Sequence, residues 1–138
     1  MFSKTIIHVI LLALAPIALS SPVLLEGRDT TATNVKCTDK AANIDEHNKN
    51  VALLQICGGI AGSIQKCGGS PTSTTGESGD AKFTLNPTDA GATINISKGR
   101  WEQCIKSAES TCSNGSAYTA TCPGGASTGD IDFELTKQ

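Results

Sequence analysis

Six cysteines are the residues of this chain whose number and spacing most plainly indicate a chemistry. An even number of cysteines is typical of a disulfide framework in an oxidising compartment. Zinc binding is the alternative, but no CxxC pair occurs and His47 is the only histidine after the N-terminal segment. We therefore predict three disulfides, with no metal site and no cofactor. The cysteines are Cys37, Cys57, Cys67, Cys104, Cys112 and Cys122.

The pairing of these cysteines stays open at the level of sequence, because six cysteines allow 15 connectivities. Cys104 and Cys112 would lie about 12 Å apart on one helix, and a disulfide needs Cα atoms within about 7 Å. The same argument separates Cys57 from Cys67 if that segment stays helical. We predict bridges between two antiparallel helices, with Cys37 and Cys122 left to pair. The predicted pairs are Cys57–Cys112, Cys67–Cys104 and Cys37–Cys122.

Acid–base and anion-binding chemistry have few candidates in this sequence. His47 lies between Glu46 and Asn48 on the polar side of a predicted helix, which is typical of a solvated residue. No GxSxG motif is present, so a serine nucleophile has no recognisable setting. Lys98, Arg100 and Lys106 could form an anion site near a helix start, although a solvated helix face explains them better. We predict no catalytic residue and no enzymatic activity.

Three acidic residues, Asp130, Asp132 and Glu134, alternate with apolar residues near the end of the sequence. They could act as paired carboxylates or as calcium ligands. The same alternation is typical of a strand with one face in solvent. We favour the solvated face.

Two N-glycosylation sequons are candidate modification sites if the chain is exported. Asn95-Ile96-Ser97 falls in a predicted strand, and Asn114-Gly115-Ser116 falls in a predicted turn. Asn114 is therefore the better acceptor. Asn86 is excluded because Pro87 follows it.

The N-terminal segment has the pattern of a secretory signal peptide. Lys4 precedes an apolar run from Ile6 to Leu19, and small residues occupy Ala18 and Ser20. The run is shorter than the roughly 20 residues needed to span a bilayer. We predict a signal peptide over 1–20 and secretion to the extracellular space. Residues 21–34 then form a flexible leader or a short propeptide, and 35–138 form one disulfide-stabilised domain.

Composition limits both the core and the partners. The formal net charge is −2, which argues against nucleic acid as a partner, because phosphate binding favours basic surfaces. Only four aromatic residues follow the predicted signal peptide, so the apolar core is small. Small secreted domains commonly compensate with disulfides. We expect a monomer. The four aromatic residues are Phe83, Trp101, Tyr118 and Phe133.

Two helices must position these groups. Apolar residues at spacings of three and four predict a helix over 39–66, although Gly58-Gly59 weakens its middle. The clearest helix covers 97–112, where Ser97 can cap it. Its apolar stripe consists of Trp101, Cys104, Ile105, Ala108 and Cys112.

The remaining segments predict strands and loops. The polar composition of 68–80 indicates a loop, and alternation in 81–85 and 92–96 indicates a hairpin. Two further strands are predicted over 117–122 and 130–135, joined by a loop over 123–129, and a short strand near Cys37. The predicted fold is an α+β two-layer sandwich, in which an antiparallel sheet carries two helices on one face.

This set of features resembles the small secreted cysteine-rich proteins of filamentous fungi, many of which act as effectors on a host. The helix that carries Ser97-Lys98-Gly99-Arg100-Trp101-Glu102-Gln103-Cys104, followed by two strands, is similar to the killer-toxin-like α/β sandwich proteins of smut-fungus viral toxins and their fungal relatives. The cysteine spacing differs from theirs, and the 68–80 loop lacks the dibasic cleavage site that some of them require. The resemblance therefore transfers no functional residue.

The first functional hypothesis is a secreted, non-enzymatic effector or killer-toxin-like factor that binds a host or competitor target, whether protein, glycan or membrane component. The loops over 68–80 and 123–129 would present the contact surface. One alternative is a small secreted hydrolase or nuclease, which requires a pocket with at least two titratable groups. The other is a cell-wall glycan-binding protein, which requires Trp101 or Tyr118 to be exposed.

Overall fold

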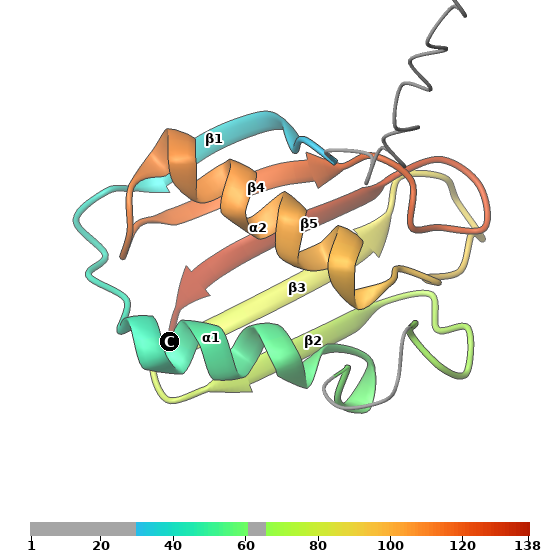
Figure 1. Ribbon diagram of the computed structural model, residues 1–138, viewed down its shortest axis with the longest axis horizontal. Coiled ribbons are helices and arrows are strands. Elements are labelled where there is room, and N and C mark those ends of the chain that lie inside the picture. The colour runs from blue at the N-terminus through green and yellow to red at the C-terminus, as the bar shows by residue number, and fades with distance from the viewer. Residues whose placement is uncertain (1–29, 61–65) are drawn as a thin grey trace, which may run out of the picture.

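The computed structural model describes residues 30–60 and 66–138, which form a five-stranded antiparallel sheet with two helices on one face (Figure 1). The strand order is β1-β4-β5-β3-β2. This confirms the predicted α+β class. The helices are α1 (Glu46–Gln55) and α2 (Lys98–Cys112), and the strands are β1 (Thr33–Asp39), β2 (Thr74–Ser78), β3 (Ala81–Pro87), β4 (Ala117–Cys122) and β5 (Ile131–Lys137).

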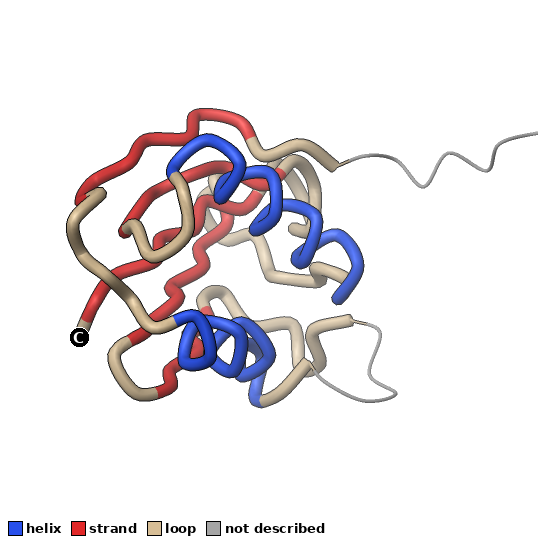
Figure 2. The backbone as a smooth tube through the Cα atoms, turned by 60° about the vertical axis from the view of Figure 1, so that its left-hand side comes forward, coloured by secondary structure: helices blue, strands red, loops and turns tan. Residues whose placement is uncertain are grey.

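The core lies between the helices and the sheet and is built around one indole ring. The rings of Phe83 and Phe133 meet the ring of Trp101 edge to face, at centroid distances of 5.2 and 5.1 Å. Tyr118 meets Phe133 in the same way at 6.2 Å. Figure 2 shows α1 and α2 as two separate helices beside the sheet. Trp101 of α2 is fully buried, and its Nε1–H donates a hydrogen bond to the Leu53 carbonyl oxygen of α1. All four of these aromatic residues are buried.

The second helix and the last two strands follow the sequence prediction. Ser97 caps α2 by accepting a hydrogen bond from the Arg100 N–H, and the five residues of the apolar stripe are all buried. In β5 the side chains of Ile131, Phe133 and Leu135 are buried against the helices.

The first helix is much shorter than predicted. It begins after Asp45, whose side chain accepts a hydrogen bond from the Asn48 N–H at 2.9 Å, and it ends at Gln55. A 3₁₀ turn over Ile56–Gly58 follows, in which Cys57 has a φ of 57°. Two glycines with positive φ come next, so the helical path is lost. The predicted residues 61–65 of this helix lie outside the described part.

The predicted loop and hairpin between the helices are also corrected. The segment 74–78 is not loop but β2, and β2 is the hairpin partner of β3 through a turn at Gly79 and Asp80. Residues 92–96 do not form a strand and make only an isolated bridge between Ile94 and Ala126. Ile94 and Ile96 are fully buried, so their alternation reflects a loop segment that inserts apolar side chains into the core.

Residues 30–34 are ordered rather than part of the predicted flexible leader. Strand β1 begins at Thr33, and Thr30 and Ala32 are buried against α2. The backbone N–H of Thr30 donates to Gln103 Oε1, and that of Ala32 donates to Ser107 Oγ. The predicted signal peptide and the rest of the leader lie outside the described residues.

All six cysteines form disulfides, as predicted, but the predicted pairing is wrong. Cys57 lies beyond the end of α1, so it is free to reach Cys67 across the short connection that follows. The two cysteines of α2 face the sheet rather than α1. The observed pairs are Cys37–Cys112, Cys57–Cys67 and Cys104–Cys122, with Cα–Cα distances of 5.3, 5.2 and 5.6 Å.

Candidate functional site

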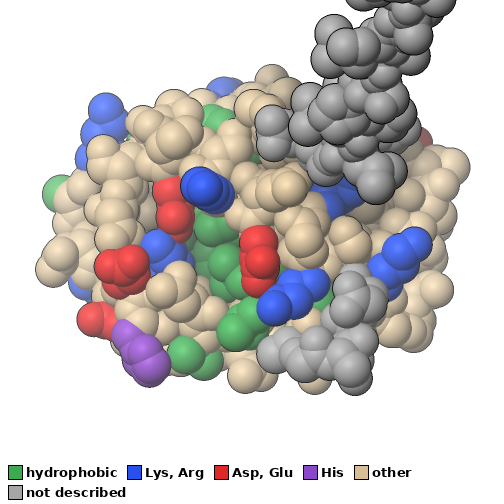
Figure 3. All heavy atoms as spheres, in the orientation of Figure 1, with side chains coloured by type: hydrophobic (Ala, Val, Ile, Leu, Met, Phe, Trp, Pro, Cys, Tyr) green, Lys and Arg blue, Asp and Glu red, His purple; other side chains and the backbone are tan. Residues whose placement is uncertain are grey.

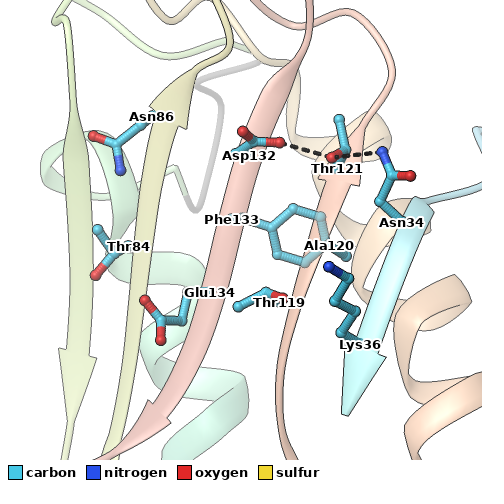
Figure 4. Close-up of a pocket in the computed structure, with 10 residues that line it drawn as sticks. All are labelled: Asn34, Lys36, Thr84, Asn86, Thr119, Ala120, Thr121, Asp132, Phe133 and Glu134. Atoms are coloured by element: carbon cyan, nitrogen blue, oxygen red, sulfur yellow. Dashed lines mark hydrogen bonds between the residues drawn. The ribbon is translucent and has the colours of Figure 1, made fainter. Parts of the chain in front are cut away.

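The face of the sheet opposite the helices carries a polar groove of about 350 Å³ (Figure 4). Strands β1, β4, β5 and β3 contribute to it. Hydroxyl, amide and charged side chains dominate its lining, while Ala120 and Phe133 have side chains buried on the helix side. The lining residues are Asn34, Lys36, Thr84, Asn86, Thr119, Ala120, Thr121, Asp132, Phe133 and Glu134.

Alternation along the central strands places these polar groups on one face. In β5, Asp132 and Glu134 are exposed between buried neighbours, and Glu134 is opposite both Thr119 of β4 and Thr84 of β3. Successive side chains of a strand point to opposite faces, so polar residues at every second position gather on the side without helices. The acids of β5 therefore lie in the middle of a hydroxyl-rich surface.

A bulge in β1 brings two further residues to the groove. Thr33 is opposite Thr121 and Lys36 is opposite Thr119, so three steps along β1 match two steps along β4. Asn34 lies within this irregularity with a φ of 52°. Bulges insert an extra residue and redirect side chains. Here the bulge allows both Asn34 and Lys36 to line the groove, and Figure 4 shows the Lys36 amine reaching from β1 over β4.

A chain of hydrogen bonds across three strands fixes one carboxylate. Asn34 Nδ2 donates to Thr121 Oγ1 at 3.3 Å, and Thr121 Oγ1 donates to Asp132 Oδ1 at 2.7 Å (Figure 4). Thr121 is only 8% exposed, so this chain is shielded from solvent at its centre. The position of the Asp132 carboxylate is thereby set before any ligand binds.

The charges of the groove are not neutralised by one another. Among the described residues, the ion pairs within 4.0 Å include neither Lys36 nor Asp132 nor Glu134. On the same side of the sheet, Lys82 and Glu77 pair across β3 and β2 at 2.8 Å. The groove thus presents one amine and two carboxylates that are available to an external group.

The sequence-predicted acids are only partly brought together. Asp132 and Glu134 share the groove, as their alternation predicts. Asp130 lies before β5, and its Oδ1 accepts a hydrogen bond from the Gly124 N–H at 2.8 Å. It therefore shapes the loop over 123–129. His47 is exposed on α1 and lines neither the groove nor the hollow beside Lys106.

The three basic residues near the start of α2 do not form one site. Lys98 pairs with Glu102 one turn later at 3.4 Å. Arg100 donates to the Pro123 carbonyl oxygen at 2.5 Å. Lys106 lines a separate hollow of about 450 Å³ beside Thr30 and Gln103. Each has its own setting, so the three do not gather into one anion site. Arg100, predicted to be solvated, is partly buried against the loop over 123–129.

A second polar cluster joins the two helices. Lys49 is 4% exposed, and its Nζ lies 2.6 Å from Glu109 Oε1 and 3.1 Å from Asn114 Oδ1. The buried hydroxyl of Tyr118 has no hydrogen-bond partner in the described structure. Burial, with a contribution from the Glu109 charge, raises the pKa of Tyr118 well above its usual range. Figure 3 shows the helix side of the molecule, where charged side chains surround an apolar strip between α1 and α2.

The two sequons differ in their surroundings. Both asparagines are exposed. The Asn114 amide accepts from Lys49 Nζ and donates to Glu46 Oε2, so it takes part in the contact between α1 and α2. Asn95 anchors its loop through its backbone, whose N–H donates to the Gly125 carbonyl oxygen at 2.8 Å. The preference for Asn114 as the better acceptor stays a prediction.

Most of the groove was not predicted from the sequence. The polar positions Thr84 and Asn86 of β3, and Thr119 and Thr121 of β4, alternate in phase with the acids of β5. Once antiparallel pairing is assumed, that phase places them on one face. No sequence pattern indicated that Asn34 lines the groove, because its position there depends on the bulge in β1.

Residues 30–60 and 66–138 define a disulfide-stabilised α+β fold with one polar sheet face that none of their helices covers. Comparisons of the chain with family models, with curated proteins and with solved structures give no significant match. No helix within residues 30–60 and 66–138 is long and apolar enough to cross a bilayer. Within those same ranges, no group of three or more His, Cys, Asp or Glu side chains is placed to hold a metal ion.

Proposed function

We propose that this protein is a secreted, non-enzymatic binding factor of the effector or killer-toxin-like kind, and that it contacts its target through the uncovered face of its sheet. The observation that carries this proposal is the groove on the antiparallel sheet, in which three charged side chains have no ion-pair partner within the described part of the chain. Binding surfaces on rigid elements lose little conformational freedom when a partner arrives.

Secretion is supported by the signal-peptide pattern of the first 20 residues and by the three disulfides. Disulfides persist mainly in oxidising compartments. Two of the three bridges have at least one fully buried cysteine, which shields those bridges from solvent.

The alternatives are less well supported. A glycan-binding protein usually offers an exposed aromatic ring, yet Trp101 and Tyr118 are both fully buried. A hydrolase would be expected to place titratable groups with displaced pKa values in its pocket. Neither Asp80 nor Tyr118, whose pKa values are displaced, lines the groove.

The proposal is tested by applying the purified protein, from Ser21 onward, to plant tissue and to competing fungi. We expect a defence response, cell death or growth inhibition in at least one system. Reduced and alkylated protein is the matched control and should be inactive, because its cross-links are lost. Absence of any response in both systems would contradict the proposal.

A further inference from the structure

The unpaired charges of the groove are separated by sign. Lys36 approaches from β1, whereas Asp132 and Glu134 belong to β5, with β4 between them. The backbones of β1 and β5 lie two strand spacings apart, about 10 Å, and the Lys36 amine reaches from β1 over β4 (Figure 4). A partner that neutralises these charges must therefore place a cation over β5 and an anion over β4, closer together than the two backbones are.

We propose that the groove docks a protein surface on which an arginine lies beside a carboxylate, with the arginine over Asp132 and Glu134 and the carboxylate facing Lys36. This inference rests on the proposed function, because it names the partner of the same face. A guanidinium is planar and offers five donors in a fixed fork, which suits neighbouring carboxylates better than a point charge does.

One carboxylate is held ready for this contact. Thr121 Oγ1 donates a hydrogen bond to Asp132 Oδ1, and this bond orients the carboxylate. Asn34, placed by the bulge, in turn fixes the Thr121 hydroxyl. An interaction with a preoriented group costs less ordering than one with a free side chain. Glu134 is exposed and supplies the second, adaptable carboxylate.

The chemistry of the face disfavours other kinds of partner. Saccharides commonly stack on aromatic rings, and the four aromatic residues of the described chain are at most 2% exposed. Two carboxylates at the centre repel phosphate groups of nucleic acid. The groove lining has no exposed large apolar side chain that would enter a lipid surface. A polar protein surface of mixed charge remains.

The test uses the folded protein labelled with ¹⁵N and a synthetic peptide, acetyl-Thr-Arg-Thr-Asp-Thr-amide, in which Arg and Asp share one face of an extended strand. We expect amide shift changes at Thr119, Thr121, Asp132 and Glu134. The same peptide with citrulline in place of arginine keeps the shape and loses the charge. It should bind on the order of fivefold more weakly, the effect of one exposed ion pair. Raising the ionic strength should also weaken the arginine peptide.

Variants of the protein provide the reciprocal test. Asp132→Asn and Glu134→Gln should each weaken binding of the arginine peptide on the order of fivefold and leave the citrulline peptide unaffected. Glu102→Gln, an exposed position on the helix side, is the matched control and should change nothing. Equal shifts with both peptides, or shifts of similar size with a chitin oligosaccharide, overturn the inference. So does the absence of any shift with the arginine peptide.

The failure of this inference can be told apart from failure of the proposed function. If the unmodified protein acts on tissue or fungi while Glu134→Gln and Lys36→Gln act equally well, the function stands and the proposed partner chemistry is wrong. If the unmodified protein has no effect, the function itself fails, whatever the peptides show.

Discussion

The indole Nε1–H of Trp101 donates a hydrogen bond to the carbonyl oxygen of Leu53 at 2.9 Å, and this contact joins α2 to the last turn of α1. The backbone N–H of Cys57, four residues after Leu53, donates to Thr74 Oγ1. The last carbonyls of a helix need partners from outside the helix. A buried side chain of the other helix therefore completes the end of α1.

Replacing Trp101 by Phe should lower the free energy of unfolding by about 2–3 kcal/mol. The change removes the partner of a buried carbonyl oxygen and leaves a cavity where the larger ring was. Denaturant titration measures the loss. Protection of the α1 amides against hydrogen exchange should fall more than that of β4, and an unchanged midpoint would contradict the role given to the indole.

A glycine contact sets the distance between α1 and β2. A Cβ added at Gly76 would lie 2.2 Å from the Ala52 carbonyl oxygen and 2.9 Å from the Ile56 nitrogen. Both atoms belong to the backbone and cannot rotate away, so Gly76→Ala should destabilise the protein by at least about 2 kcal/mol. The matched control is Gly99→Ala in the first turn of α2, where nothing lies within 4 Å.

The control substitution should be neutral or stabilise by up to about 1 kcal/mol, since alanine is the better helix former. Thermal melting of the two variants side by side decides the matter. A Gly76→Ala variant that melts with the wild-type protein would mean that β2 can move away from α1 at little cost.

The three disulfides should differ in their contribution to stability. The chain-entropy model assigns about 4.5 kcal/mol to the Cys37–Cys112 bridge, which closes 75 residues, and about 2.7 kcal/mol to Cys57–Cys67, which closes 10. We therefore expect the Cys37→Ala/Cys112→Ala double variant to unfold at a lower guanidinium concentration than Cys57→Ala/Cys67→Ala. The reverse order would show that native-state packing, rather than loop closure, determines the ranking.

Stability should depend on pH through Asp80. A hydrogen bond from the Asn48 side chain lowers the pKa of Asp80 below its ordinary value of 3.8, and burial opposes this effect. The Asp45 backbone N–H and the Lys137 charge lower the pKa further. A folded-state pKa below the unfolded value stabilises the fold at higher pH, and the stabilisation is lost as pH falls through the folded value.

Asp80→Asn should therefore be less stable than the wild-type protein near pH 6, and the difference should shrink near pH 2. Melting temperatures across this range measure the effect. Asp89→Asn, an exposed aspartate after β3, serves as the control for loss of a charge alone. A gap between Asp80→Asn and the wild type that stays constant with pH would exclude titration of Asp80 as its cause.

The parts of the fold that the sequence predicted well are those in which periodicity and capping agree. Helix α2 has a Ser97 cap and an unbroken apolar stripe, and β5 alternates strictly, so local pattern and tertiary packing favour the same structure. In 92–96 the alternation was real but its cause was different, since Ile94 and Ile96 enter the core from a loop.

The failures arose where tertiary contacts override composition. Residues 74–78 are polar and contain Gly76, which predicts a loop, yet the close approach of α1 requires a residue without Cβ at that position. The predicted disulfide pairing is wrong because the predicted first helix is too long. It includes Cys57, whereas α1 ends at Gln55. The groove depends on a bulge, and no local pattern marks where a strand gains a residue.

The positions of the three cross-links divide the molecule unequally. Two of them tie α2 to β1 and β4, and the third closes the segment between α1 and β2. No disulfide joins one of these halves to the other. Strand β5 lies between β4 and β3 and is held to them by hydrogen bonds and packing, with one ion pair from Lys137 to Asp80 at the β2–β3 turn. Under partial denaturation the sheet should separate along β5. The unit formed by α1, β2 and β3 should then unfold cooperatively, while the unit formed by α2, β1 and β4 stays folded.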